Sequence, residues 1–144
     1  MEITPRCRTA LNYATESLAR FHHSHVSSAH LVLGLLTFHG GVADNLLRKA
    51  GLSVQSVESY LSSRRSSAEE STIQDGVPLG TSARLAFERA EAETRTRQNT
   101  YLGIEHLLLG ILAEESGEAT DLFASVHIDR DNIRRAVTEE MDQA

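Results

Sequence analysis

The sequence predicts an all-α protein made of two tandem four-helix repeats that pack as a pseudo-twofold bundle. One observation behind this prediction is an internal duplication: a shift of 76 residues places "SSAHLVLGLL" (27–36) on "GIEHLLLGIL" (103–112) without a gap. Another is the spacing of apolar residues, which recur within each copy at the three- and four-residue intervals typical of helices. A length of 144 residues with 40% hydrophobic residues fits one folded domain.

The duplication extends well beyond this motif. Identical residues under the same shift are Arg8 and Arg84, Ala10 and Ala86, Ala14 and Ala90, Gly41 and Gly117, Ala43 and Ala119, and Leu46 and Leu122. Two copies are too few to stack as a solenoid, so we expect two similar bundles that pack against each other.

The first two helices of the first copy have clear starts. The first begins after Thr4, because threonine followed by proline is a typical N-cap with proline in the first turn. Its apolar face consists of Cys7, Ala10, Leu11, Ala14 and Leu18. The second helix is capped by Ser27 or Ser28, and its stretch "HLVLGLL" is apolar on almost all sides. This composition predicts a central helix buried by several neighbours.

The third helix is expected over about residues 41–50, with Gly51 at the left-handed position that ends many helices. Ser53 caps a fourth helix, and the second copy repeats this plan with Asp129 as the cap of its last helix. We therefore expect one domain, residues 1–144, with repeat 1 at about 1–62 and repeat 2 at about 81–144. The polar segment between them, about 63–80, is rich in serine and glycine and is interpreted as a linker.

The composition argues against several classes of partner. The net charge of −6 opposes binding to nucleic acid or to an anionic membrane surface, since both attract basic proteins. The longest apolar run, Leu31 to Leu36, is far shorter than the roughly 20 residues of a membrane-spanning helix. The start of the sequence lacks the hydrophobic region of a signal peptide, and the single cysteine fits a reducing compartment. We expect a cytoplasmic protein with neither nucleic acid nor membrane as a partner.

The sequence contains no recognisable catalytic motif. Its only lysine, Lys49, lies outside any glycine-rich phosphate-binding turn, so this chain is not expected to bind or hydrolyse ATP. Gly-x-Ser-x-Gly and His-Glu-x-x-His motifs are also absent, and Cys7 lies on an apolar helix face as a core residue. We therefore predict no enzymatic activity, no catalytic residue and no cofactor.

The histidines in "FHHSHVSSAH" (21–30) raise the question of a metal site, because imidazole is a common metal ligand. The repeat shift pairs the loop histidines with other residues: His22 with Gln98, His23 with Asn99 and His25 with Tyr101. We therefore interpret this cluster as a solvated loop without a metal. Only His30 has a histidine counterpart, His106, and both are expected to donate a ring N–H to a backbone carbonyl.

Five segments carry a family resemblance: "TPRCRTALNYA", "SSAHLVLGLL", "GGVADNLLRKAGLS", "TSARLAFERAEAE" and "LGIEHLLLGILAEESGEA". Together they resemble the double-repeat N-terminal domain of the Clp unfoldases, such as ClpA and ClpC, over nearly the whole chain. The resemblance implies an all-helical pseudo-dimer that sits on an ATPase ring and receives substrates and adaptor proteins. It also implies that this domain has no catalytic activity of its own.

The ClpC-like members imply a further feature, two equivalent pockets that bind phosphorylated arginine. Each pocket uses a threonine at the start of a repeat and the glutamate directly before the shared histidine. In the first copy Thr4 is present and Ala29 replaces the glutamate; in the second Glu105 is present, but Gly80 holds the threonine position and Thr81 follows it. The candidate partner-binding residues are therefore Thr4, Thr81 and Glu105. We expect one working pocket, in which Glu105 and Thr81 accept an arginine-like group.

Three functions remain open at this point. The first is a non-catalytic module that docks substrate or adaptor proteins for a Clp ATPase ring, in cis or in trans. The second is a free-standing regulator of the same fold that competes for adaptors, substrates or small-molecule ligands. The third is a small metal-dependent hydrolase that uses the histidine loop, and it ranks last because its acid–base partners are missing.

Overall fold

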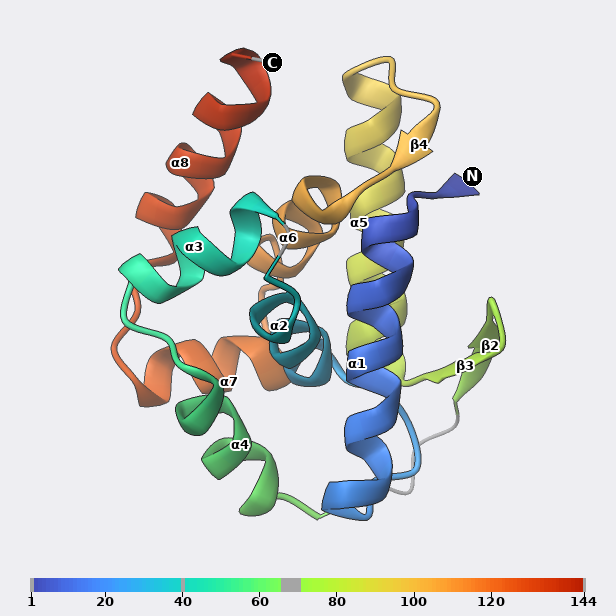
Figure 1. Ribbon diagram of the computed structural model, residues 1–144, viewed down its shortest axis with the longest axis vertical. Coiled ribbons are helices and arrows are strands. Elements are labelled where there is room, and N and C mark those ends of the chain that lie inside the picture. Colours follow the sequence, from blue (N-terminus) through green and yellow to red (C-terminus); the bar gives the residue numbers. More distant parts are fainter. Residues whose placement is uncertain (1, 40, 66–70, 144) are drawn as a thin grey trace.

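The computed structural model describes residues 2–39, 41–65 and 71–143, which form eight helices in two sets of four (Figure 1). The first set comprises α1 (Pro5–Phe21), α2 (Ser28–Thr37), α3 (Val42–Lys49) and α4 (Val54–Ser62). The second set comprises α5 (Thr81–Thr96), α6 (Ile104–Leu112), α7 (Glu118–Ser125) and α8 (Arg130–Gln143). Each helix of the second set begins 76 residues after its counterpart, so the predicted all-α fold with two four-helix repeats is confirmed.

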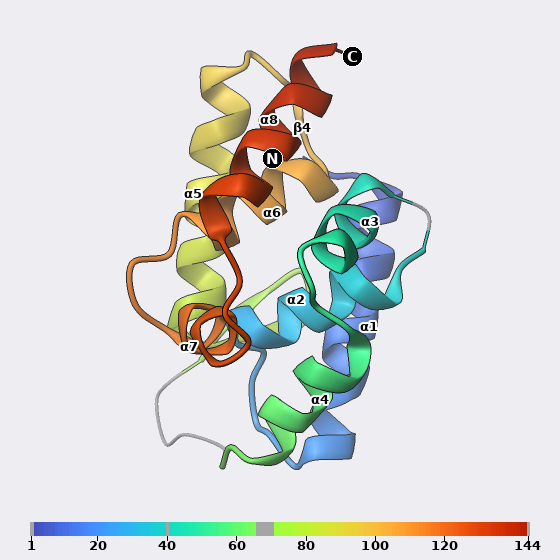
Figure 2. The same ribbon diagram turned by 90° about the vertical axis from the view of Figure 1, so that its left-hand side faces the viewer.

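The two apolar helices α2 and α6 lie in the centre of the molecule, with α1 and α5 on one side and α8 on the other (Figure 1). In the view turned by 90°, α3 and α4 lie on the same side as α1 (Figure 2), and α7 packs against α2 and α6. Every residue of α2 from Ser28 to Leu36 is buried, as the prediction of a central helix requires. In α6 every residue is buried except Glu105. None of the described helices is long and apolar enough to cross a membrane.

The predicted N-caps act as expected. The Oγ1 atom of Thr4 accepts a hydrogen bond from the backbone N–H of Cys7 at 3.1 Å, and the Oγ atom of Ser53 accepts one from Ser56 at 3.1 Å. Ser27 caps α2, and Asp129 accepts a backbone hydrogen bond at the start of α8. These caps satisfy backbone donors that have no partner within the helix, which fixes the helix starts.

In each repeat the long helix contacts the central helix at a glycine: α1 contacts α2 at Gly34, and α5 contacts α6 at Gly110. A Cβ atom built on Gly34 of α2 would lie 2.2 Å from the carbonyl oxygen of Ala10 in α1. A Cβ atom on Gly110 of α6 would lie 2.2 Å from the carbonyl oxygen of Ala86 in α5. Because only a residue without Cβ permits this approach, the same contact holds each repeat together.

Short parallel strand pairs cross-connect the repeats, which the sequence analysis did not predict. Strand β1 (Glu2–Ile3) pairs with β4 (Tyr101–Leu102), and the N–H of Thr4 donates to the carbonyl of Leu102 at 3.0 Å. At the equivalent place Val26 bridges Leu79, and the N–H of Gly80 donates to the carbonyl of Val26 at 2.8 Å. The start of α1 therefore lies beside α6, and the start of α5 lies beside α2.

The segment between the repeats contains a hairpin. Strands β2 (Thr72–Gln74) and β3 (Val77–Leu79) pair in antiparallel fashion around Asp75 and Gly76, which have φ angles of 52° and 78°. Two positive φ angles match the turn that closes tight hairpins. Val77 and Leu79 are buried, so part of the predicted linker contributes to the core, while its residues 66–70 lie outside the described part of the chain.

Candidate functional site

One pocket lies where three helices begin. It has a volume of about 380 Å³ and is bounded by the first residues of α1 and α6 and by the residue before α3. Its lining consists of Thr4, Pro5, Arg6, Gly41, Tyr101, Gly103, Ile104 and Glu105. We call this place the first junction.

The first junction brings Thr4 and Glu105 together. A Cβ atom on Gly103 would lie 3.7 Å from Cγ2 of Thr4 and 3.5 Å from Oε2 of Glu105, so both side chains flank the same glycine. Thr81, in contrast, opens α5 beside α2, because Gly80 bonds to Val26 there. The expected pairing of Thr81 with Glu105 is therefore replaced by the pairing of Thr4 with Glu105. The physical reason is that β1 pairs with β4, which places the start of α1, not the start of α5, beside α6.

The electrostatics of the first junction suit a ligand with both signs of charge. Helix starts carry partial positive charge and free N–H donors, and α3 and α6 begin at Gly41 and Gly103 without a side-chain cap. The carboxylate of Glu105 lies at the same place, and no partner holds it among the described residues. The junction can therefore accept an anionic group at the helix starts and a cationic group at Glu105.

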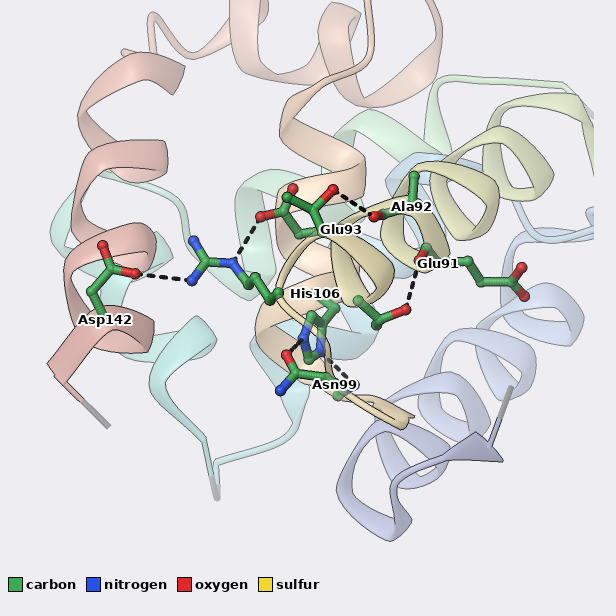
Figure 3. A network of polar contacts seen from close by, with 10 residues as sticks. Glu91, Ala92, Glu93, Asn99, His106 and Asp142 are labelled. Atoms are coloured by element: carbon green, nitrogen blue, oxygen red, sulfur yellow. Dashed lines mark hydrogen bonds and ion pairs between the residues drawn. The ribbon is translucent and has the colours of Figure 1, made fainter.

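A second cavity of about 570 Å³ adjoins the first junction and shares Tyr101 and Glu105 with it. Its only arginine, Arg97, donates to Glu93 at 2.8 Å and to Asp142 at 3.0 Å (Figure 3). These two hydrogen bonds raise the pKa of Arg97 above its usual value. Arg97 is thus committed to other carboxylates, which leaves Glu105 available to a partner.

The two shared histidines are structural, although not in the expected way. Nδ1 of His30 accepts from the N–H of Ser27 at 2.9 Å, and Nδ1 of His106 accepts from Gly103 at 3.0 Å. The hydrogen therefore sits on Nε2, which in His30 donates to Nδ1 of His23 at 2.8 Å. In His106 it donates to Oδ1 of Asn99, also at 2.8 Å (Figure 3). The predicted bonds to backbone carbonyls are wrong, because side chains of the preceding loop take that place.

The histidine loop is also less solvated than expected. His25 is buried, and Nε2 of His23 donates to the carbonyl of Arg64 at 2.9 Å. His23 holds the position of Asn99, so it belongs to the shared architecture after all. Within the described ranges, no three His, Cys, Asp or Glu side chains lie close enough to hold a metal ion.

Cys7 is fully buried on α1, as the apolar pattern indicates. Burial raises the pKa of its thiol to about 12, with Arg8 opposing this shift and Glu105 adding to it. Since the thiolate is the reactive form, Cys7 is an inert core residue at neutral pH.

Comparison with known proteins identifies one protein family whose model matches nearly the whole chain. The family model for the "Clp repeat (R) N-terminal domain" matches residues 2–126 and 81–144. A probable ATP-dependent Clp protease ATP-binding subunit of Chlamydia pneumoniae is 28% identical over 141 residues, a match that covers 98% of this chain. The chain spans only 17% of that relative's length.

Two solved structures share the fold. The N-terminal domain of the chaperone ClpD from Arabidopsis thaliana matches with a TM-score of 0.80 at 19% identity, over 98% of this chain and 95% of that one. A ClpV N-domain in complex with a VipB peptide matches with a TM-score of 0.63 at 21% identity, over 92% and 82% of the two chains. With its duplicated helices and a family match along nearly all of its length, this chain belongs to the Clp repeat N-terminal domain family.

Proposed function

We propose that this chain is a non-catalytic protein-binding module that docks substrate or adaptor proteins for a Clp ATP-dependent unfoldase or protease in the cytoplasm. Membership of the Clp repeat family supports this role, and a related ClpV N-domain has been solved with a peptide bound. The ATPase ring is reached either in cis or in trans. The observation that carries the proposal is the first junction, where Thr4 and Glu105 meet beside three helix starts.

The ligand group that fits this junction is an arginine side chain that carries a phosphate. The guanidinium end matches the carboxylate of Glu105, which has no other partner in the described chain. The phosphate matches the starts of α3 and α6, where helix dipoles and free N–H groups favour an anion. Thr4 adds a hydroxyl at the edge of the same pocket.

Replacing Glu105 by alanine is expected to weaken binding of a peptide with one phosphorylated arginine by more than about tenfold, since a charge-assisted hydrogen bond contributes about 1.5–3 kcal/mol. Isothermal titration calorimetry measures this change. The matched control is Glu139→Gln, which removes an exposed carboxylate of α8 that lines neither cavity. Equal affinity of Glu105→Ala and wild type, with both folded by circular dichroism, contradicts the proposed site.

A further inference from the structure

The starts of three helices also meet at a second junction, which the repeat symmetry relates to the first. There α2, α5 and α7 begin together, and hydrogen bonds between Ser28, Ser82 and Glu118 connect them. Among the positions that differ in chemistry between the second junction and the first, Ser28 corresponds to Ile104, Ser82 to Arg6, Glu118 to Val42, and Glu114 to Phe38.

At the second junction the chain's own side chains satisfy the helix starts. Oγ of Ser82 accepts from the N–H of Ser28 at 2.9 Å and donates its own hydrogen to Oε2 of Glu118. Oγ of Ser28 accepts from the N–H of Ala119 at 2.8 Å. The serine side chains therefore supply hydrogen-bond acceptors for the starts of α2 and α7, and Ser82 is itself bonded to the carboxylate of Glu118.

A second buried carboxylate supports the same helix starts. Glu114 is only 2% exposed, and its Oε1 accepts from the N–H of Thr120 in the first turn of α7 at 2.8 Å. Gly117 allows this approach, because a Cβ atom there would lie 2.7 Å from Cδ of Glu114. Negative charge at a helix start is favourable, so α7 receives from Glu114 and Glu118 what an external anion would supply.

The first junction has none of these acceptors. Val42 and Ile104 offer only hydrocarbon where Glu118 and Ser28 bond in the second junction, and Arg6 stands in the place of Ser82. All four glycine-capped helices, α3, α5, α6 and α7, begin without a side-chain cap at the glycine itself. The junctions differ in that side chains from elsewhere accept from the first turn of α7, whereas among the described residues none accepts from the first turns of α3 and α6, which lie at the pocket of about 380 Å³. The two junctions thus share a backbone arrangement but differ in whether an anion is already present.

We infer that Glu118, held by Ser82, occupies at the second junction the place that a partner's phosphate takes at the first. The second junction is a latent copy of the site, closed by the chain's own carboxylate, and Ala29 there also lacks the carboxylate that Glu105 supplies. The chain therefore binds one phosphorylated arginine per molecule. This inference rests on the proposed function and adds its stoichiometry and the residues that set it.

The unaltered protein gives the first test. Calorimetry with a peptide carrying one phosphorylated arginine is expected to give one site per chain. In amide NMR spectra the signals of Val42, Ile104 and Glu105 shift with peptide, while those of Ser28 and Ala119 stay in place. Two bound peptides per chain, or shifts at both junctions, overturn the inference and leave the proposed function standing; no binding at all contradicts the proposed function itself.

Exchanging the junction residues gives the second test. Val42→Glu places a carboxylate in the first turn of α3, directly after Gly41 of the first junction, and is expected to weaken peptide binding by at least tenfold, whereas the neutral control Val42→Gln keeps most of the affinity. The double variant Glu118→Val with Ala29→Glu is expected to bind two peptides per chain. Adding Glu105→Ala to this double variant is expected to reduce the number to one. Unchanged affinity in a folded Val42→Glu variant overturns the inference, even if the double variant fails to fold.

Discussion

Replacing Gly110 by alanine is expected to destabilise the protein by about 3 kcal/mol, the upper part of the range for overpacked cores. The new Cβ atom would lie 2.2 Å from the carbonyl oxygen of Ala86 and 3.0 Å from the backbone nitrogen of Ala90. Neither backbone atom can move without shifting α5 away from α6. Gly34→Ala is expected to have a similar effect, since its Cβ atom would lie 2.2 Å from the carbonyl oxygen of Ala10.

Urea unfolding measures this loss as a lower midpoint at an unchanged slope. Gly103→Ala serves as the control, because its nearest neighbour would be 3.5 Å away and its φ angle of −104° suits any residue. We expect that control to lose less than about 1 kcal/mol, the usual scale for an N-cap change. A Gly110→Ala variant as stable as the control would show that α5 and α6 are not in such close contact.

Acidification is expected to destabilise the fold through its buried histidines. Burial lowers the pKa of His30 to about 3, with smaller effects from His23 and His25, and burial also lowers the pKa of His106. An unfolded histidine titrates near 6.5, so between about pH 6.5 and pH 3 the unfolded chain binds more protons than the folded one. For His30 the free energy of unfolding therefore decreases as the pH falls through this window, by up to about 1.4 kcal/mol per pH unit, and His106 contributes in the same direction.

The contribution of His30 is measured as a difference between variants, because carboxylates titrate in the same window. His30→Gln is expected to be less stable than wild type at pH 7 and to show a shallower loss between pH 6 and pH 4. The control His127→Asn replaces an exposed histidine at a position whose φ angle of 56° suits asparagine, so it removes an imidazole without disturbing the core. Parallel curves for His30→Gln and wild type would mean that His30 takes up a proton in the folded protein as readily as in the unfolded chain, which contradicts the lowered pKa.

The helical part of this fold could be predicted from the sequence because helices with one buried face place apolar residues at three- and four-residue intervals. The apolar run of α2 and its copy in α6 gave the centre, and Thr4 and Ser53 gave helix starts that the structure retains. The strands β1 and β4 could not be recognised in this way, because two residues are too few to show the alternation of apolar and polar residues that is typical of a strand. The crossed connection of the repeats could therefore not be derived from periodicity.

The sequence analysis named Thr4, Thr81 and Glu105 as candidates but expected Glu105 beside Thr81, whereas the structure places it beside Thr4. Thr4 and Glu105 lie in different repeats, 101 residues apart (105 − 4) in the sequence, and the crossed strands bring them to one pocket. A signal was nevertheless present. The glutamate is missing from one copy and the threonine from the other, so pairing within copies gives two half sites, while pairing across copies gives one complete site and one empty site. Glu118 was missed because its counterpart Val42 is an ordinary apolar residue.

The parallel pairing of β1 with β4 also has a consequence for synthesis on the ribosome. Glu2 leaves the exit tunnel early, but its partner Tyr101 follows only after the whole first repeat, the hairpin and α5. Closing so long a loop costs entropy that neighbouring contacts do not repay until α6 is complete. The first repeat therefore stays without its β4 partner during this time, and the pocket at Thr4 forms only after α6 has been made.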